Sequence, residues 1–308
     1  MRNFTKNIKM KTIKNIALII FLLLSITINA QNNIDTTKFK NYCNHERCKD
    51  YNDKYHLNPF YNGHLCENFN PEQIDFSKEY YELQTKRYQN NENILNQLIK
   101  YDFSKIWFSR NQEHNGIIGK NYQRIQIHID TVYKNTYDDK NYIVIGKSKV
   151  KDNICSFKGD IKIISIFIDK DCDYEDFSNC GDLFASYTFY EDSTQYHSGI
   201  FKGITECSIY VDNKNKKVIL DDLSDGADGY WNRSFVGTWT NYSKTLQKKC
   251  IWGDYRLPFT FDFDCGDGEM HINDKYANNG WKTFNDGTEI VNVANDLWET
   301  KDKWWLKK

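Results

Sequence analysis

The sequence predicts a mainly β protein, an antiparallel barrel or sandwich, preceded by a small α-helical segment that carries cysteines. The spacing of apolar residues changes after Gly119 from about 3.6 residues to 2, the repeat of a strand. Short runs of aromatic and β-branched residues then follow at intervals of about 8–15 residues, with no helical pattern between them. We therefore expect a leader over 1–30, an irregular and helical segment over 31–115, and an antiparallel β domain over 116–308.

The first thirty residues have the three parts of a secretory signal peptide. Basic residues precede the apolar run Ile16–Leu24, and Ile28-Asn29-Ala30 offers a cleavage site. The run is shorter than the ~20 residues that a membrane-spanning helix needs. We expect a mature protein that is exported to the periplasm or the extracellular space and has no transmembrane segment.

Residues 31–115 divide into an irregular part and a helical part. The stretch 31–70 is polar and punctuated, whereas two apolar stripes with helical spacing follow, the first on Phe76, Tyr80 and Leu83 and the second over 94–99. Ser77 is suited to cap the first helix. We expect one helix over 77–100, or two short helices broken near 90–91, and a last turn over 102–108.

The β domain is expected to contain a series of short strands and one clear hairpin turn over 212–216. The expected strands share β-branched and aromatic composition, and they cover residues 125–129, 142–150, 161–168, 183–190, 200–202, 207–211, 217–220, 235–240, 250–255, 269–272 and 290–293. Trp304-Trp305-Leu306 is expected to cover an edge strand.

The charge of the mature chain argues against nucleic acid as a partner. Loss of five basic leader residues from 41 leaves 36 Lys and Arg against 42 Asp and Glu, a net charge of −6. A protein that binds the phosphate backbone needs the opposite sign.

All nine cysteines lie after the expected cleavage site, and export favours disulfides over metal ligands. Cys43/Cys48, Cys172/Cys180 and Cys250/Cys265 are neighbours that could close, although spacing does not fix the pairing. The alternative is a metal site from the cysteines and histidines of 43–66, whose spacing fits no common zinc pattern. Three Asp-rich clusters, over 169–176, 221–228 and 262–269, are typical of turns, and the first lacks the Gly and Glu of a calcium loop. We expect no metal and no cofactor.

No motif predicts a catalytic centre. The chain has neither a G-x-S-x-G elbow nor an H-E-x-x-H pair. His128, His197 and His271 lie on or beside expected strands, where each could meet a carboxylate such as Asp130 or Glu191. Paired carboxylates for glycoside hydrolysis are defined by their distance in space, so the sequence leaves that chemistry open.

Clustered aromatic residues predict a binding surface instead. Tyr230, Trp231, Trp252 and Tyr255 are the candidate contact residues, with Asn232, Asp228 and Asp254 placed to accept hydrogen bonds from hydroxyls. Their rings could equally fill a β core. Strand alternation places Trp239 with the core.

Two parts of the sequence resemble known groups of proteins. Gly237-Thr238-Trp239 resembles the G-x-W signature of lipocalin-type barrels, although here the motif lies late in the chain. The run 146–155, together with 237–239 and 249–256, is similar to exported bacterial proteins of unknown function. That resemblance implies a shared β fold and export, and it carries no activity.

From these observations we expect an exported, non-catalytic protein that binds a glycan or a protein partner. A secreted glycan-acting hydrolase with Asp and Glu catalysts is the alternative, and a lipocalin-like carrier of a small molecule is the third. Exposure of the tryptophans distinguishes a surface site from a packed core.

Overall fold

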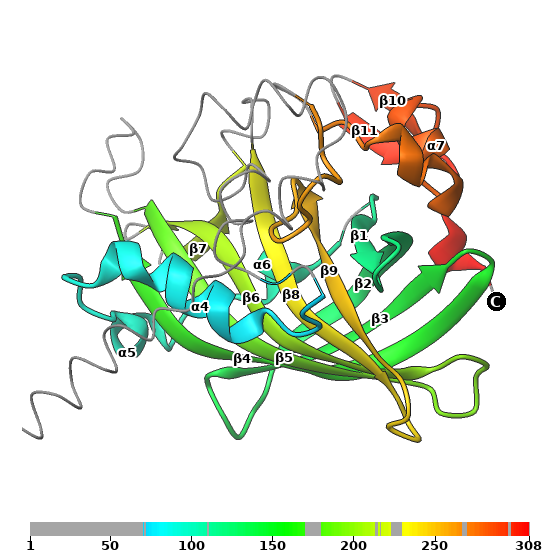
Figure 1. Cartoon of the computed structure of the whole chain (residues 1–308). Coiled ribbons are helices and arrows are strands. Elements are labelled where there is room, and N and C mark those ends of the chain that lie inside the picture. Colours follow the sequence, from blue (N-terminus) through cyan, green and yellow to red (C-terminus); the bar gives the residue numbers. More distant parts are fainter. Residues whose placement is uncertain are drawn as a thin grey trace, which may run out of the picture. The chain divides into compact units, whose positions relative to one another are not determined.

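A closed barrel of eight antiparallel strands forms the centre of the protein (Figure 1). This computed structural model describes residues 70, 72–109, 111–169, 180–212, 215, 217–222, 230–266, 270–294 and 297–307. The predicted leader and the segment 31–69, with its first three cysteines, lie outside the described residues. The predicted mainly β, antiparallel architecture is confirmed, and of the two predicted forms, barrel and sandwich, the protein adopts the barrel.

Each strand of the barrel pairs with the next one, and the last pairs with the first. The ring consists of β1 (His114–Ile118), β2 (Gln123–Lys134), β3 (Asn141–Val150), β4 (Asn153–Ile168), β5 (Cys180–Glu191), β6 (Gly199–Asp212), β8 (Trp231–Asn241) and β9 (Gln247–Tyr255). The first half of β6 pairs with β8, whereas its second half pairs with the short strand β7 (Lys217–Leu220) through the predicted hairpin. β7 therefore extends the sheet beyond the ring.

Three of the predicted strands differ from the structure. The runs 200–202 and 207–211 belong to one long strand, β6, because the residues between them pair without interruption with β5 and β8. In the run 269–272, the described residues 270–272 form no strand, since Ile272 makes only an isolated bridge to Asp264. β1 was not predicted, because its five residues, HNGII, carry little alternation.

Aromatic side chains fill the barrel. Trp252 stacks on Phe235 with ring centroids 5.0 Å apart, and Tyr187 and Phe201 meet Trp252 edge-on at 5.2 and 5.5 Å. All four rings are at most 1% exposed. Gly116 makes room for them, because a Cβ there would lie 2.4 Å from the Cβ of Trp252. The interior is a packed core.

Helices precede the barrel and divide as the break near 90–91 predicted. α4 (Ser77–Thr85) continues into the 3-10 turn η2 (Lys86–Tyr88), and α5 (Leu95–Leu98) and α6 (Ser104–Trp107) follow. The expected Ser77 cap is wrong, since Ser77 is the first helical residue and the Asp75 carboxylate accepts its N–H over 2.9 Å. Leu98, Phe103 and Trp107 pack into the barrel core from one end, where Trp107 contacts Tyr142 at 5.3 Å.

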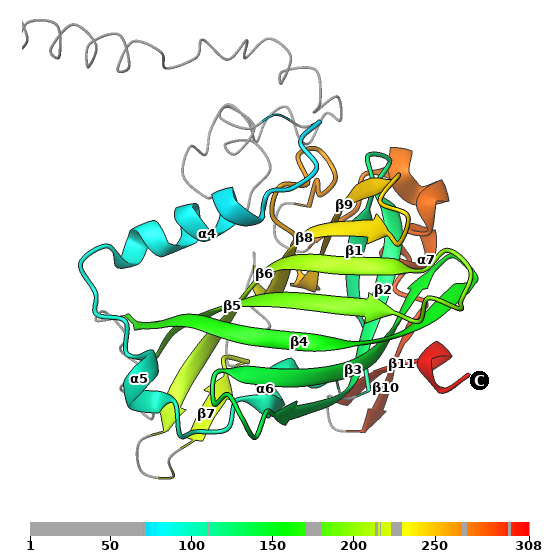
Figure 2. The same cartoon turned by 90° about the horizontal axis from the view of Figure 1, so that it is seen from below.

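The two ends of the barrel therefore differ (Figure 2). We call the end at which α6 lies the helix end. The opposite end, which carries the β3–β4, β5–β6 and β8–β9 turns, is the hairpin end.

A second apolar cluster covers the outer face of β1, β8 and β9. It joins α4 to the segment 257–285, which includes the 3-10 helix η3 (Asp274–Asn279) and α7 (Lys282–Asn285). β10 (Ile290–Ala294) and β11 (Leu297–Thr300) form a separate ribbon. In the last turn, η4 (Trp304–Leu306), Trp305 stacks on His128 of β2 at 4.1 Å. The C-terminal tryptophans thus cover the outer face of a barrel strand rather than an edge.

Three cysteines of the barrel are free, contrary to the expectation that most cysteines form disulfides. Cys155, Cys207 and Cys250 are free thiols buried in the barrel, so a Cys250/Cys265 disulfide, one of the pairings that spacing allowed, does not form. Alternation on β4, β6 and β9 places these three thiols on the inner face, where burial raises the pKa of Cys155 to about 11. Cys43, Cys48, Cys66 and Cys172 lie outside the described residues. In the part of the chain that the structure covers, no helix is long and apolar enough to cross a membrane.

Candidate functional site

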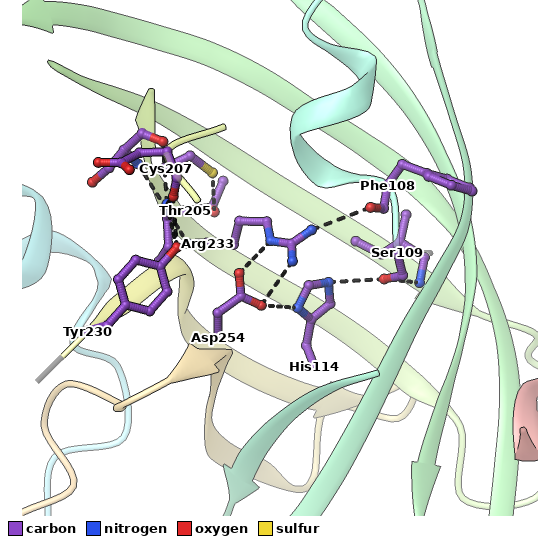
Figure 3. Close-up of polar contacts among 12 residues, drawn as sticks. Phe108, Ser109, His114, Thr205, Cys207, Tyr230, Arg233 and Asp254 are labelled. Carbon is purple, nitrogen blue, oxygen red and sulfur yellow. Dashed lines mark hydrogen bonds and ion pairs between the residues drawn. The ribbon is translucent and has the colours of Figure 1, made fainter. Parts of the chain in front are cut away.

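Four polar side chains meet inside the barrel at the helix end (Figure 3). His114 Nδ1 lies 2.9 Å from Asp254 Oδ1, and His114 Nε2 lies 3.0 Å from Ser109 Oγ. Arg233 donates two hydrogen bonds to the Asp254 carboxylate, from Nε over 2.6 Å and from Nη2 over 3.2 Å. The order of serine, histidine and aspartate is that of a nucleophile, its base and the acceptor that orients the base. We call these four residues the interior network.

A bulge in β8 brings Arg233 into this network. The register between β8 and β9 shifts between Asn232 and Phe235, and Arg233 has a φ of 44°. The Asn232 side chain supports this left-handed backbone, because its Oδ1 accepts the N–H of Arg233 over 2.7 Å and that of Ser208 over 2.9 Å. Bulges redirect side chains in this way.

The other members come from the ends of neighbouring elements. Asp254 is the last residue of β9 whose side chain points into the barrel. His114 is the first such residue of β1, the strand that pairs with β9. Ser109 follows α6, and its N–H donates to Ile129 O of β2 over 3.1 Å. The network thus joins the segment that closes the helix end to three barrel strands.

The charges of the network are balanced. Burial alone would raise the pKa of Asp254, but Arg233 and His114 outweigh it and lower that pKa to about 2. Burial, together with the positive charge of Arg233, lowers the pKa of His114. An ionised aspartate therefore faces one guanidinium and one neutral imidazole, which donates from Nδ1 and accepts the Ser109 hydroxyl proton at Nε2.

Ser109 lacks the access that a nucleophile requires. It is 2% exposed, and its Oγ also accepts the N–H of Ile129 over 3.1 Å. Every member of the network has a hydrogen-bond partner within the protein, and burial keeps solvent and substrate from Ser109 Oγ in this fold. As folded, the interior network stabilises the closed helix end.

The predicted aromatic residues do not form one surface. Trp252 is 0% exposed, because β9 alternation points it into the barrel with Cys250, so it takes no part in a surface contact. Tyr230 and Tyr255 do meet, with ring centroids 5.4 Å apart, and Trp231 pairs with Tyr255 across β8 and β9. Tyr255 is 54% exposed, whereas Tyr230 and Trp231 are half-buried.

The predicted hydrogen-bonding partners of that surface are also corrected. Asn232 is 0% exposed and supports the bulge, and Asp254 belongs to the interior network. Asp228 lies outside the described residues. Trp239 does face the core, as predicted, and its Nε1 donates to Glu191 Oε2 over 2.9 Å.

Exposed apolar side chains gather instead at the hairpin end. The β5–β6 and β8–β9 turns and the strand ends beside them carry four of them: Tyr190 (49% exposed), Tyr196 (76%), Tyr242 (38%) and Leu246 (45%). Gly199 and Asn241 pair across β6 and β8, which sets the two turns side by side. We call these four residues the tyrosine rim.

A buried carboxylate holds the rim in place. Glu191 accepts hydrogen bonds from Ser148 Oγ of β3, from Trp239 Nε1 and, over 2.7 Å, from the N–H of Gly199. The hydroxyl of Tyr242 donates to the Glu191 carbonyl. Burial raises the pKa of Glu191, and these donors oppose that rise. The rim thus sits on backbone fixed by β3, β5, β6 and β8.

Local side-chain contacts fix the two turns themselves. Asp192 Oδ1 accepts from the N–H of Thr194 over 2.9 Å, and Asn241 Oδ1 accepts from those of Thr245 and Leu246, each over 3.0 Å. Sequence reasoning missed the rim, although these short polar residues beside tyrosine are a turn signal.

Comparisons with protein-family models, with curated proteins and with solved structures find no match. Within the described ranges, no three His, Cys, Asp or Glu residues gather as they would around a metal ion. In the third Asp-rich cluster, Asp262 accepts from Tyr276 over 2.8 Å and Asp264 pairs with Arg256 over 2.5 Å. These contacts use the carboxylates as structural acceptors.

Proposed function

We propose that the protein is an exported, non-catalytic binding protein that contacts a glycan through the tyrosine rim. The observation that carries this proposal is the exposure of three tyrosines on backbone that buried contacts hold rigid. A tyrosine ring offers a flat apolar face with little rotamer entropy to lose, and a rigid support lowers the free-energy cost of binding. The leader supports export.

A glycan is favoured over a protein partner by the groups around the rim. The exposed neighbours include side chains with hydroxyl groups, which can exchange hydrogen bonds with sugar hydroxyls. These residues are Ser193, Thr194, Ser243 and Thr245. A protein partner is the outcome to expect if the rim proves essential for binding but no glycan binds. The filled barrel gives a lipocalin-like carrier less support, because such a carrier needs an interior cavity.

The test is binding of the mature protein to an immobilised panel of neutral and anionic polysaccharides, measured by biolayer interferometry. The double variant Tyr190→Ala/Tyr196→Ala should bind at least about tenfold more weakly than wild type. Tyr137→Ala is the matched control, since Tyr137 is 98% exposed on the β2–β3 turn at the helix end. Equal binding by wild type and the double variant would contradict the proposal.

The surface predicted from the sequence provides a second arm of the same experiment. Tyr230 and Tyr255 form a pair at the helix end, and Tyr255→Ala removes the more exposed of these two rings. Loss of binding in Tyr255→Ala, with the rim variant unaffected, would move the contact to the helix end.

Hydrolysis is the second candidate, because Ser109, His114 and Asp254 contact one another in the order of a catalytic triad. If the helix end opens in solution, Ser109 could act as a nucleophile with His114 as its base. A fluorophosphonate probe tests this directly. Labelling of wild type that is absent in Ser109→Ala would establish a serine hydrolase, whereas an unlabelled wild type supports the binding function.

Among the described residues, Asp182 and Glu206 are a candidate pair for the glycan hydrolase with carboxylate catalysts. Both lie on the outer face of the barrel, and Arg87 of η2 bridges them. They are 5% and 0% exposed beneath the α4–η2 segment, so they do not face an open cleft.

A further inference from the structure

The contact between the α4–η2 segment (Ser77–Tyr88) and the barrel buries more negative than positive charge. Arg87 Nη2 donates to Asp182 Oδ2 over 2.6 Å and also to Glu206 Oε1. Both carboxylates are buried, whereas the Arg87 side chain is 41% exposed. One guanidinium therefore serves two carboxylates.

Asp182 is the better satisfied of the two as an anion. Besides Arg87, it accepts from Ser208 Oγ over 2.7 Å and from the Tyr88 hydroxyl. Glu206 shares the same guanidinium and accepts over 2.5 Å from the hydroxyl of Tyr80 on α4. The surplus negative charge therefore falls on Glu206.

The groups around Glu206 can accept a hydrogen bond from its protonated carboxyl. Ser234 Oγ is buried beside the Tyr80 hydroxyl, and among the described residues it has no other hydrogen-bond partner. A protonated Glu206 can donate to the Tyr80 oxygen, and Tyr80 can then donate to Ser234. In this relay the Ser234 oxygen accepts a hydrogen bond from Tyr80. Burial, opposed by Arg87, raises the pKa of Glu206 to about 8.

We propose that docking of the α4–η2 segment onto the barrel takes up one proton at Glu206, so that docking is tightest at acidic pH and weakens progressively as the pH rises into the alkaline range. Among the described residues, the titratable and charged groups that act on Glu206 are Tyr80 from α4, Arg87 and Tyr88 from η2, and Asp182 from β5. Burial raises the pKa of both tyrosines, which stay neutral, and Arg87 stays charged. Glu206 is thus the group that titrates.

The direction follows from the two states of Glu206. With the segment undocked, this carboxyl would be exposed and would have a pKa near its ordinary value of 4.5. A group whose pKa is raised by docking favours the docked state below its undocked pKa, and this contribution is lost as pH rises through the docked value. Between about pH 6 and about pH 9 the docking equilibrium should weaken on the order of tenfold to a hundredfold.

The test is amide hydrogen exchange of α4 in the full mature chain at both pH values, corrected for the intrinsic exchange rate. Protection of the α4 amides should fall at least about tenfold at the higher pH, relative to the amides of β3 and β4 in the same samples. Glu206→Gln, which carries an amide in place of the protonated acid, should keep equal protection at both pH values. Asp160→Asn is the control, since Asp160 is a carboxyl on β4 whose pKa burial also raises. It should behave as wild type.

Two results would overturn the proposal. The first is equal corrected protection of wild-type α4 at both pH values, which needs no variant. The second is a fall in Glu206→Gln as large as that in wild type. Either result is independent of glycan binding, so the binding function is tested separately.

Discussion

The two ends of the barrel use buried polar groups for different purposes. At the helix end, the interior network satisfies Ser109, His114 and Asp254 entirely within the protein, and α6 packs over it. At the hairpin end, Glu191 is equally well satisfied, but the turns that it holds carry exposed tyrosines. One network therefore closes the fold, and the other supports a surface.

The comparison teaches that residue type alone does not identify a functional site. Serine, histidine and aspartate in the right order suggest chemistry, yet burial and an arginine make them a structural connection. Tyrosine in a turn has no reactive group at neutral pH, yet exposure on a rigid support makes it suited to recognition.

The largest effect on stability is expected at the centre of the barrel. Trp252→Ala removes a ring that four aromatic residues surround, and it should lower the free energy of unfolding by ~3–5 kcal/mol. Urea denaturation measures this. A loss of less than about 1 kcal/mol would mean that the interior is loosely packed, and it would revive the carrier hypothesis.

The next effect tests the helix end. Asp254→Asn leaves Arg233 buried without its counter-ion and should lower the free energy of unfolding by ~3 kcal/mol, whereas Asp192→Asn at the hairpin end should cost less than ~1 kcal/mol. The same denaturation series compares them. If Asp254→Asn costs no more than Asp192→Asn, the interior network does not stabilise the closed end.

Acid should weaken the interior network at two steps. The pKa of His114 is lowered in the fold, so its contribution to stability is present above its ordinary value of 6.5 and is lost as pH falls below it. The pKa of Asp254, lowered from 3.8 to about 2, adds a second loss as pH falls from about 4 towards 2. The second step should be worth ~2 kcal/mol, and Asp254→Asn should remove it. A pH series of urea midpoints tests this, and the account fails if the variant keeps both steps.

Much of the fold could be predicted from the sequence. Alternation revealed β2, β-branched and aromatic composition revealed β3 to β5, β8 and β9, and the polar turn over 212–216 revealed the β6–β7 hairpin. β1 escaped prediction because His114 and Gly116 occupy inward positions that sequence reasoning assigns to apolar residues. The histidine is buried only because Asp254 and Ser109, far apart in sequence, meet it there.

The candidate site was less predictable. Trp252 belongs to a sequence cluster of aromatic residues, but strand register decided that it points inward while Tyr255 points outward. The bulge at Arg233, which single-sequence patterns do not reveal, decides in turn which side chains of β8 face the interior. The tyrosine rim is assembled from two hairpins that closure of the barrel brings together.

The smallest stability effects are expected at the tyrosine rim, and they give the most direct test of the binding function. Tyr190→Ala/Tyr196→Ala should change the free energy of unfolding by less than ~1 kcal/mol, because both side chains are at least 49% exposed. The decisive measurement is glycan binding by this variant at matched folded concentration, beside wild type and Tyr137→Ala. We predict at least about tenfold weaker binding for the rim variant alone. Equal glycan binding by all three proteins would contradict the account.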